Sequence, residues 1–248
     1  MPRGFAGLGP GFAGFGFRGA SLELLAIELA YFLAVIALCL IIYKKTNTIY
    51  QISQHKGLYY FRNIFLFFSL AYLFRLIHII FVLSQELFFP GLPLRLFFPF
   101  TFFFVGFFGT MAILSLSMAA LIKTTKLVED KKAPYMLYII ALALSLAVAL
   151  TRSNPALMVL QAVLLATAIL VVFLKPGEKK TKKLLSQNRL TFLLLAVFWI
   201  VNLLAFTRHL APFHVKIPLY VLSISVFASI FLRVEKRLPS HDKKKRQA

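Results

Sequence analysis

The chain has 248 residues, of which 60% are hydrophobic and 15% are charged, and its formal net charge is +20 at pH 7. A mean hydropathy of +0.84 exceeds what the core of a water-soluble domain needs, which excludes a soluble globular protein. The Lys and Arg residues lie in short segments between long apolar runs, a pattern typical of membrane topology signals that argues against nucleic acid as a partner.

Seven apolar runs are each long enough to cross a bilayer as a helix. A span needs about 20 apolar residues and must satisfy its own backbone polar groups, and these runs are too long for barrel strands. The expected helices cover residues 21–43, 58–83, 97–122, 134–150, 155–174, 190–207 and 213–232. The sequence therefore predicts an all-α, polytopic protein of the cell membrane, folded as a seven-transmembrane-helix bundle.

Lys and Arg are distributed unequally between the two sets of connecting segments. The segments after the first, third, fifth and seventh helices carry twenty of them, and the opposite side carries six. Because cytoplasmic loops are enriched in Lys and Arg, this pattern predicts an N-terminus outside and a C-terminus in the cytoplasm. The expected parts are a flexible Gly- and Phe-rich outer tail at 1–20, the seven-helix domain at 21–232 and a basic cytoplasmic tail at 233–248.

Two of the expected cytoplasmic segments, 175–189 and 233–246, are polybasic. Each cation near an anionic leaflet can gain about 1 kcal/mol, so we expect anionic lipid as a partner at the cytoplasmic face. The same segments could dock a separate signalling or membrane-protein partner. Residues 44–57 mix apolar and polar side chains and are a candidate for a short helix in the membrane interface.

Glu28 and Arg75 are ionisable residues inside expected spans. Each lies about two turns below the outer end of its helix, which puts both about 10 to 12 Å deep. A charge at the centre of a span costs about 2.5 to 3.5 kcal/mol on insertion scales, so each needs a partner or a purpose. We expect a buried ion pair between Glu28 and Arg75 that holds the first helix against the second.

The remaining polar side chains of the spans also gather toward the outer side, which predicts a ligand cavity open to that side. Its expected lining residues are Glu28, Arg75, His78, Gln161, Trp199, Asn202 and His214. The alternative is that each of these side chains is satisfied locally or extends to the interface by itself.

Several outer residues are of metal-ligating types, namely Glu23, Glu28, His78, His209 and His214. His209 and His214 are five residues apart across a Pro, which is not the spacing of a helical metal site, so we expect no metal and no cofactor. Ser115 and Ser117 fall in the inner half of the third helix, away from these histidines. No catalytic Ser–His pair is therefore expected, and the absence of such a pair or metal motif favours a protein that is not an enzyme.

The stretch from Gly57 to Ile77, GLYYFRNIFLFFSLAYLFRLI, resembles a segment of uncharacterised archaeal seven-helix membrane proteins. It is also similar to the seven-helix sensor regions that precede microbial histidine kinases. The resemblance covers one helix and its cytoplasmic lead-in, and it implies a sensor-like membrane domain. Because no kinase or other output domain follows Arg233, the expected signal passes to a separate partner.

The expected layout is also that of rhodopsins and G-protein-coupled receptors. Microbial rhodopsins need a lysine in the middle of the seventh helix for retinal, whereas Lys216 lies at the outer end of that helix here. Retinal is therefore not expected.

These observations favour a sensor or receptor-like membrane protein that takes a small or lipid-like ligand from the outer side. A small-molecule or ion transporter is the first alternative, although the sequence has no internal repeat of helices that would indicate two inverted halves. A structural or assembly subunit of a membrane complex is the second. An intramembrane enzyme would require the outer histidines to converge on a metal.

Overall fold

The computed structural model describes residues 22–87, 94–121, 132–151, 154–173, 182–206 and 213–235. Over these residues the chain forms helices and no strands, which confirms the all-α prediction for this part of the chain. The helices are α1 (Leu22–Ser53), α2 (Lys56–Leu87), α3 (Leu94–Leu121), α4 (Ala133–Thr151), α5 (Asn154–Phe173), α6 (Lys182–Phe206) and α7 (Phe213–Glu235). The expected outer tail at 1–20 and most of the basic tail lie outside the described residues.

Five of the described helices are long and apolar enough to cross a membrane: α1, α2, α3, α4 and α7. The other two contain shorter apolar stretches, Ala156–Leu170 in α5 and Leu190–Leu204 in α6. Helices of this length and composition support a membrane-embedded protein, because lipid favours segments that satisfy all their backbone hydrogen bonds internally.

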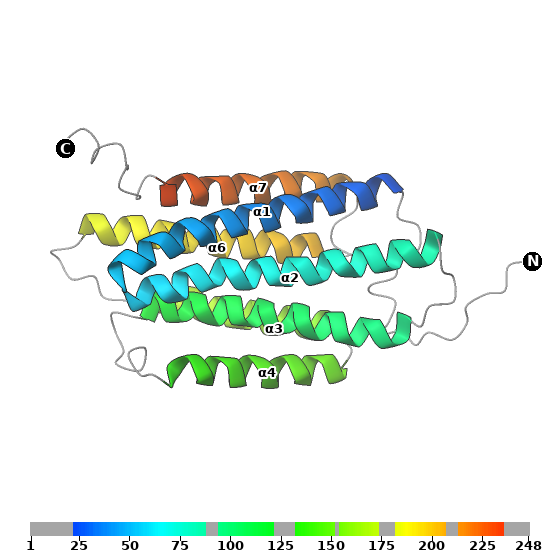
Figure 1. Cartoon of the computed structure of the whole chain (residues 1–248), viewed down its shortest axis with the longest axis horizontal. Coiled ribbons are helices and arrows are strands. Elements are labelled where there is room, and N and C mark those ends of the chain that lie inside the picture. The colour runs from blue at the N-terminus through cyan, green and yellow to red at the C-terminus, as the bar shows by residue number, and fades with distance from the viewer. Residues whose placement is uncertain are drawn as a thin grey trace, which may run out of the picture.

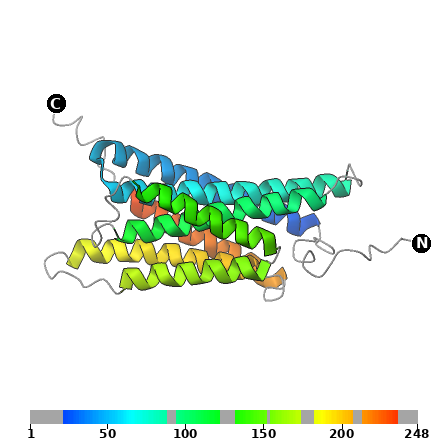
Figure 2. The ribbon, with the colours of Figure 1, turned by 90° about the horizontal axis from the view of Figure 1, so that it is seen from below.

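The helices run side by side along the long axis of the molecule (Figure 1). Contacts between neighbours close a ring in the order α1, α2, α3, α5, α6 and α7, and α4 packs outside this ring against α3 and α5. Figure 1 places α4 at the edge of the bundle, and Figure 2, seen from that edge, shows it in front. The ring encloses the interior where the polar residues meet.

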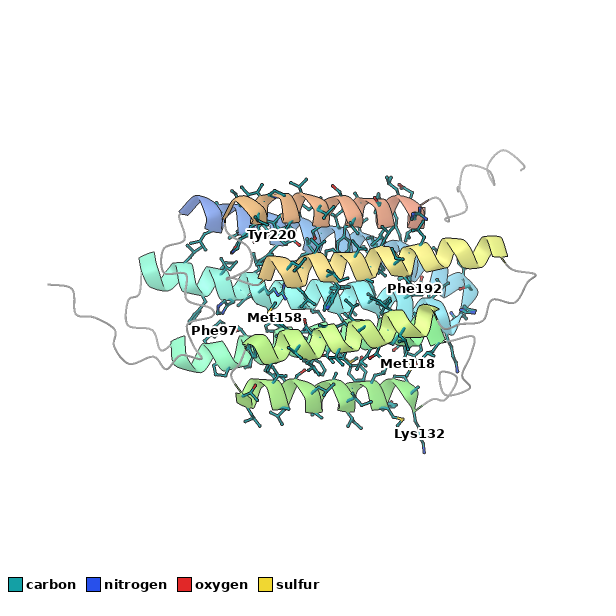
Figure 3. All side chains as sticks on the ribbon, turned by 180° about the vertical axis from the view of Figure 1, so that it is seen from behind. Phe97, Met118, Lys132, Met158, Phe192 and Tyr220 are labelled. Carbon is teal, nitrogen blue, oxygen red and sulfur yellow. The ribbon has the colours of Figure 1, made fainter. Side chains whose placement is uncertain are left out.

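Consecutive helices run in alternating directions. In Figure 3, Phe97, Met158 and Tyr220 lie toward one end of the bundle, and Met118, Lys132 and Phe192 lie toward the other. The first three belong to the early turns of α3, α5 and α7, which begin on the predicted outer side. This alternation is what the uneven distribution of Lys and Arg requires.

The helix ends nearest the predicted cytoplasm differ from expectation. Residues 44–57 do not form a separate interfacial helix: they continue α1 to Ser53 and begin α2, with only a turn at Gln54 (φ 51°) between them. The guanidinium of Arg62 lies 4.2 Å from the ring centre of Tyr50 and 5.0 Å from that of Tyr59, which fastens this hairpin. Runs of apolar residues predict only the part of a helix that contacts lipid, so the prediction did not include these polar extensions. The expected start of α6 at residue 190 was too late for the same reason, since the helix begins at Lys182.

The Phe-rich α3 packs chiefly against α2. The rings of Phe74 and Phe104 stack at 4.5 Å between centres, and those of Phe81 and Phe97 stack at 4.0 Å. On another face of α3, a Cβ added at Gly106 would lie 3.4 Å from Leu157, so the glycine allows α5 to approach closely. These phenylalanines thus act as packing residues between α2 and α3.

The helix α4, which lies outside the ring of six helices, buries one narrow face and exposes the opposite face. Its buried residues follow each other at intervals of three or four: Ala133, Leu137, Ala141, Ser145 and Val148. On the opposite face Tyr135, Ile139 and Leu150 are 71%, 66% and 75% exposed. An apolar face of this kind suits contact with lipid chains.

Candidate functional site

A buried hydrogen-bond network joins four helices inside the ring. The Tyr31 hydroxyl of α1 donates to Asn202 Oδ1 of α6 at 2.8 Å and lies 2.8 Å from Ser223 Oγ of α7. The Tyr72 hydroxyl of α2 donates to the same Asn202 oxygen and lies 3.4 Å from the Tyr31 hydroxyl. All four side chains are buried. We call these residues the Tyr31 network.

Asn202 is the shared partner in this network because its side chain both accepts and donates. Its Nδ2 donates to the Phe198 carbonyl oxygen at 2.8 Å and to Ser223 Oγ at 3.3 Å, while its Oδ1 accepts from the two tyrosines. Polar side chains that bond across helices in this way hold transmembrane bundles together. The Asn202 amide is therefore fully engaged within the protein.

A charged cluster lies one turn from the Tyr31 network, toward the predicted outer side. The Glu28 carboxylate of α1 accepts from Lys216 Nζ and from the Tyr220 hydroxyl of α7, both at 2.9 Å. The Tyr220 ring stacks on that of Tyr31, with 4.3 Å between centres and 18° between planes. We call Glu28, Lys216 and Tyr220 the charged cluster, which joins α1 to α7.

The expected ion pair between Glu28 and Arg75 is wrong, because Lys216 is the cation that pairs with Glu28. An estimate of depth along two helices does not decide which way each side chain points around its helix axis. The α1 helix packs against both α2 and α7, and Glu28 faces α7. The Arg75 guanidinium lies instead 5.2 Å from the ring centre of Tyr72 on its own helix.

Three phenylalanines fill the interior on the other side of the Tyr31 network, toward the predicted cytoplasm. Phe68, Phe198 and Phe227 come from α2, α6 and α7, and each is four residues along its helix from a network member. The rings of Phe198 and Phe227 lie 4.2 Å apart, and those of Phe68 and Phe198 lie 5.3 Å apart. At most 3% of any of the three is exposed. We call these three residues the aromatic layer, which lies between the Tyr31 network and the inner parts of α2, α6 and α7.

A cavity borders the Tyr31 network between α2, α3, α5 and α6. Its lining residues are Phe68, Ala71, Tyr72, Arg75, Val105, Gly109, Gln161, Trp199, Asn202 and Leu203. The cavity is small: the volume in which the centre of a water molecule can lie is about 10 Å³. This is room for about one water.

Gly109 makes room for the polar side chains of the cavity. A Cβ at this position would lie 2.6 Å from Gln161 Nε2 and 3.7 Å from Trp199 Cη2, so any larger residue would displace the amide. Gln161 is 2% exposed and Trp199 is 6% exposed. Trp199 Nε1 has no hydrogen-bond partner within the described part of the chain.

The structure brings together four of the seven residues expected at the site. Arg75, Gln161, Trp199 and Asn202 line the cavity. Glu28 is absent from this lining and lies in the adjoining charged cluster, where Tyr220 stacks on Tyr31.

The two histidines expected at the site have different outcomes. His78 is buried at the α2–α3 contact, where its Nδ1 lies 3.3 Å from Thr101 Oγ1, and it does not line the cavity. The side chain of His214, like the whole of His209, lies outside what the structure describes. Among the described residues, no three or more His, Cys, Asp or Glu side chains gather as metal ligands would.

Sequence reasoning missed the tyrosines of this region. Tyr31, Tyr72 and Tyr220 were counted with the apolar residues of their spans, although a buried tyrosine hydroxyl needs a hydrogen-bond partner. A usable signal was present in α7, where Lys216, Tyr220 and Ser223 recur at intervals of four and three and so share one helical face.

The fold and the buried network define an all-helical, membrane-embedded protein with its polar groups gathered at a helix junction. The chain is similar to a protein of Archaeoglobus fulgidus that is described only as uncharacterised, with 26% identity over 221 residues, which cover 88% of this chain and 95% of the relative. No protein-family model and no solved structure matches the chain. The comparison thus supports similarity to an uncharacterised archaeal protein. The expected resemblance to seven-helix membrane proteins and to the sensor regions of histidine kinases stays a prediction.

Removing the cation of the charged cluster should destabilise the protein strongly. The Lys216→Met variant leaves the Glu28 carboxylate buried without its ion pair, and we expect it to lower the free energy of unfolding by about 3 kcal/mol. The double variant Glu28→Gln with Lys216→Met should recover most of that loss. Unfolding in detergent micelles measures both, and equal stability of the single and double variants would contradict the pairing.

Two serines of α7 provide a matched test of the Tyr31 network. Ser223→Ala removes a partner of both Tyr31 and Asn202, and we expect it to cost about 1 kcal/mol of unfolding free energy. Ser225→Ala removes only a bond to the carbonyl oxygen of Val221 on an exposed face and should cost close to nothing. The same unfolding assay compares them, and equal losses would contradict a special role for Ser223.

Proposed function

We propose that the protein is a receptor-like membrane sensor that takes a small polar ligand from the outer side into the cavity between α2, α3, α5 and α6. The ligand changes the packing of the helices, and the basic cytoplasmic segments transmit the change to a separate partner. The observation that carries the proposal is that Tyr72 and Asn202 belong both to the cavity lining and to the Tyr31 network.

This shared pair of residues would couple ligand binding to helix packing. The cavity lies between α2, α3, α5 and α6, whereas the Tyr31 network ties α1 and α7 to α2 and α6. The space present suits about one water, so a larger ligand must move the helices apart in order to enter. A ligand that binds only the opened arrangement shifts the population toward it, which is the requirement for a sensor.

The aromatic layer favours sensing over transport. A transporter gives its substrate access to both sides of the membrane, usually through interrupted helices near the midplane. Here Phe68, Phe198 and Phe227 pack together between α2, α6 and α7 directly beneath the Tyr31 network, and α2 and α6 continue past them without interruption.

The proposal includes a topology of seven spans with the N-terminus outside. We expect a cysteine at Val215, at the start of α7, to react with a membrane-impermeant maleimide on intact cells. A cysteine at Ile52, at the end of α1, should react only after permeabilisation. Cys39 is the chain's single cysteine and is buried, so a Cys39→Ala background leaves one reactive thiol in each variant. The reverse labelling pattern would contradict this topology.

Ligand binding can be followed through Trp199, because it is the chain's single tryptophan and lines the cavity. The purified protein in nanodiscs is titrated with a panel of amino acids, short carboxylates, sugars and polyamines while its tryptophan emission and melting temperature are recorded. We expect at least one class to shift the emission and to raise the melting temperature, since a ligand that binds only the folded state stabilises it.

Two glycines of α3 supply the control for this titration. Gly109→Ala pushes the Gln161 amide into the cavity and should abolish the response. Gly106→Ala, one turn away, places its Cβ in ordinary contact with Leu157 and should leave the response intact. A panel without any response, or a response that survives in Gly109→Ala, would overturn the proposed function.

A further inference from the structure

We propose that the cavity is a site for an uncharged oxygen group, a hydroxyl or a carbonyl, whose oxygen accepts a hydrogen bond from Trp199 Nε1. This inference rests on the proposed function and narrows the chemical class of the ligand. It follows from the indole N–H of Trp199, from the amide of Gln161 in the same lining and from the charged lining residue, which already interacts within the protein.

The indole N–H of Trp199 is a polar group of the cavity without a partner. The residue is 6% exposed, and its Nε1 has no hydrogen-bond partner within the described part of the chain. An indole nitrogen can donate a hydrogen bond but cannot accept one, so the group that it needs is an acceptor. A buried donor without a partner is costly, and an acceptor that enters the cavity removes that cost.

The neighbours of the indole fix its position. Its ring lies 4.4 Å from the ring of Phe68, measured between centres, and a Cβ added at Gly109 would lie 3.7 Å from its Cη2. Phe68 and Gly109 both line the cavity as well. A donor that is held in place in this way needs little rearrangement when an acceptor arrives, and such pre-organisation increases affinity.

Gln161 of α5 brings a second polar group to the same cavity. The residue is 2% exposed, and its amide occupies the space that Gly109 leaves on α3. A side-chain amide offers donors at Nε2 and an acceptor at Oε1. It can therefore donate to the oxygen of a carbonyl or hydroxyl, and it can also accept from the O–H or N–H of the ligand.

The other polar residues of the lining interact within the protein. The Tyr72 hydroxyl donates to Asn202 Oδ1, and the Asn202 amide donates in turn to α6 and α7. The Arg75 guanidinium lies 5.2 Å from the ring centre of Tyr72. In the described lining, the polar side chains left to bind an occupant are then Trp199 and Gln161, and both are neutral.

A neutral ligand suits this lining better than a charged one. A charged group loses its hydration on burial and needs an opposite charge to compensate. Among the described lining residues there is no Asp or Glu that would receive a cation. An anion would have to compete with the contacts that Arg75 already makes within the protein. An uncharged oxygen group avoids both costs and still accepts from Trp199 Nε1.

The size of the cavity agrees with an acceptor that consists of one oxygen atom. Its volume of about 10 Å³ has room for a group the size of one water. A hydroxyl or a carbonyl oxygen is such a group, and the rest of the ligand enters only if the helices separate. Occupancy is therefore linked to the helix movement that sensing requires.

The test compares three compounds of nearly the same shape: acetamide is neutral, acetate is an anion and acetamidinium is a cation. Each is titrated at constant ionic strength into the protein in nanodiscs, while the Trp199 emission and the melting temperature are recorded. We expect a saturable response to acetamide at concentrations at least about tenfold below those for either ion, because burial of an uncompensated charge costs more than a factor of ten. In the panel of the proposed function, we expect the sugars to respond, since they are its uncharged class.

The two glycines of α3 again supply the control. Gly109→Ala should abolish the response to acetamide, because it pushes the Gln161 amide into the cavity. Gly106→Ala lies outside the lining and should keep the response, so the pair reports any effect of the probes elsewhere in the protein or in the lipid.

Two variants identify the groups that bind the oxygen. Trp199→Phe keeps an aromatic ring but removes the N–H, and we expect it to weaken acetamide binding about fivefold, the factor that one ordinary hydrogen bond provides. Because this change also enlarges the cavity, a site that selects by shape alone would bind acetamide at least as well. Gln161→Met keeps the length of the side chain, removes the amide and should weaken binding by a similar factor. Melting temperature and calorimetry follow both variants, and Gln161→Met decides if Trp199→Phe does not fold.

The outcomes separate the two proposals. The site for an uncharged oxygen would be overturned by the lack of a response to acetamide, by a response to either ion at equal or lower concentrations, or by unchanged acetamide binding in the deciding variant. A response to any other compound that Gly109→Ala abolishes would still leave the proposed function standing. The absence of a response to every compound, the three probes included, would overturn both.

Discussion

The hydroxyl of Tyr31 meets Asn202, Ser223 and Tyr72 at one point inside the bundle, so residues from four helices depend on one another there. In lipid a helix cannot turn an unsatisfied polar group toward solvent, and the alternative to these bonds is a costly buried donor or acceptor. This requirement fixes how α1, α2, α6 and α7 are rotated about their axes. The charged cluster on one side and the aromatic layer on the other follow from the same rotation, because both lie one turn along the same helix faces.

The molecule is therefore divided along its axis into parts of different character. Toward the predicted outer side, Glu28 and Lys216 form an ion pair and Arg75 lines a small cavity. Toward the predicted cytoplasm, phenylalanine rings of α2, α6 and α7 pack beneath the Tyr31 network, and α1 and α2 extend as a hairpin fastened by Arg62. In the proposed function, a signal that begins at the cavity would reach the inner end through the helices that share the Tyr31 network. The α4 helix stands outside this arrangement and presents an apolar face that suits lipid.

The candidate site was only partly predictable. Arg75, Gln161, Trp199 and Asn202 were found because polar residues are rare in apolar spans and their depth follows from helical rise. The tyrosines were missed because a tyrosine ring suits an apolar span, and only its neighbours reveal whether its hydroxyl is used. The partner of Glu28 was wrong because two cations, Arg75 and Lys216, lay within reach by depth, and depth says nothing about which neighbouring helix a side chain faces.

The composition and the lengths of the apolar runs by themselves determined that the described chain is helical, that its helices are apolar enough for a membrane, and approximately where each helix lies. The reason is that a segment that crosses a bilayer must have a certain length and must satisfy all its backbone hydrogen bonds. The uneven placement of Lys and Arg determined the predicted orientation. Only the tertiary structure decided that α4 lies outside the ring, that Glu28 pairs with Lys216, and that Asn202 joins the cavity to the Tyr31 network. These features depend on how each helix is rotated about its axis and on which helices are neighbours. Both are determined by contacts between residues that are far apart in the chain, such as Tyr31 and Ser223, and a local sequence pattern does not contain such contacts.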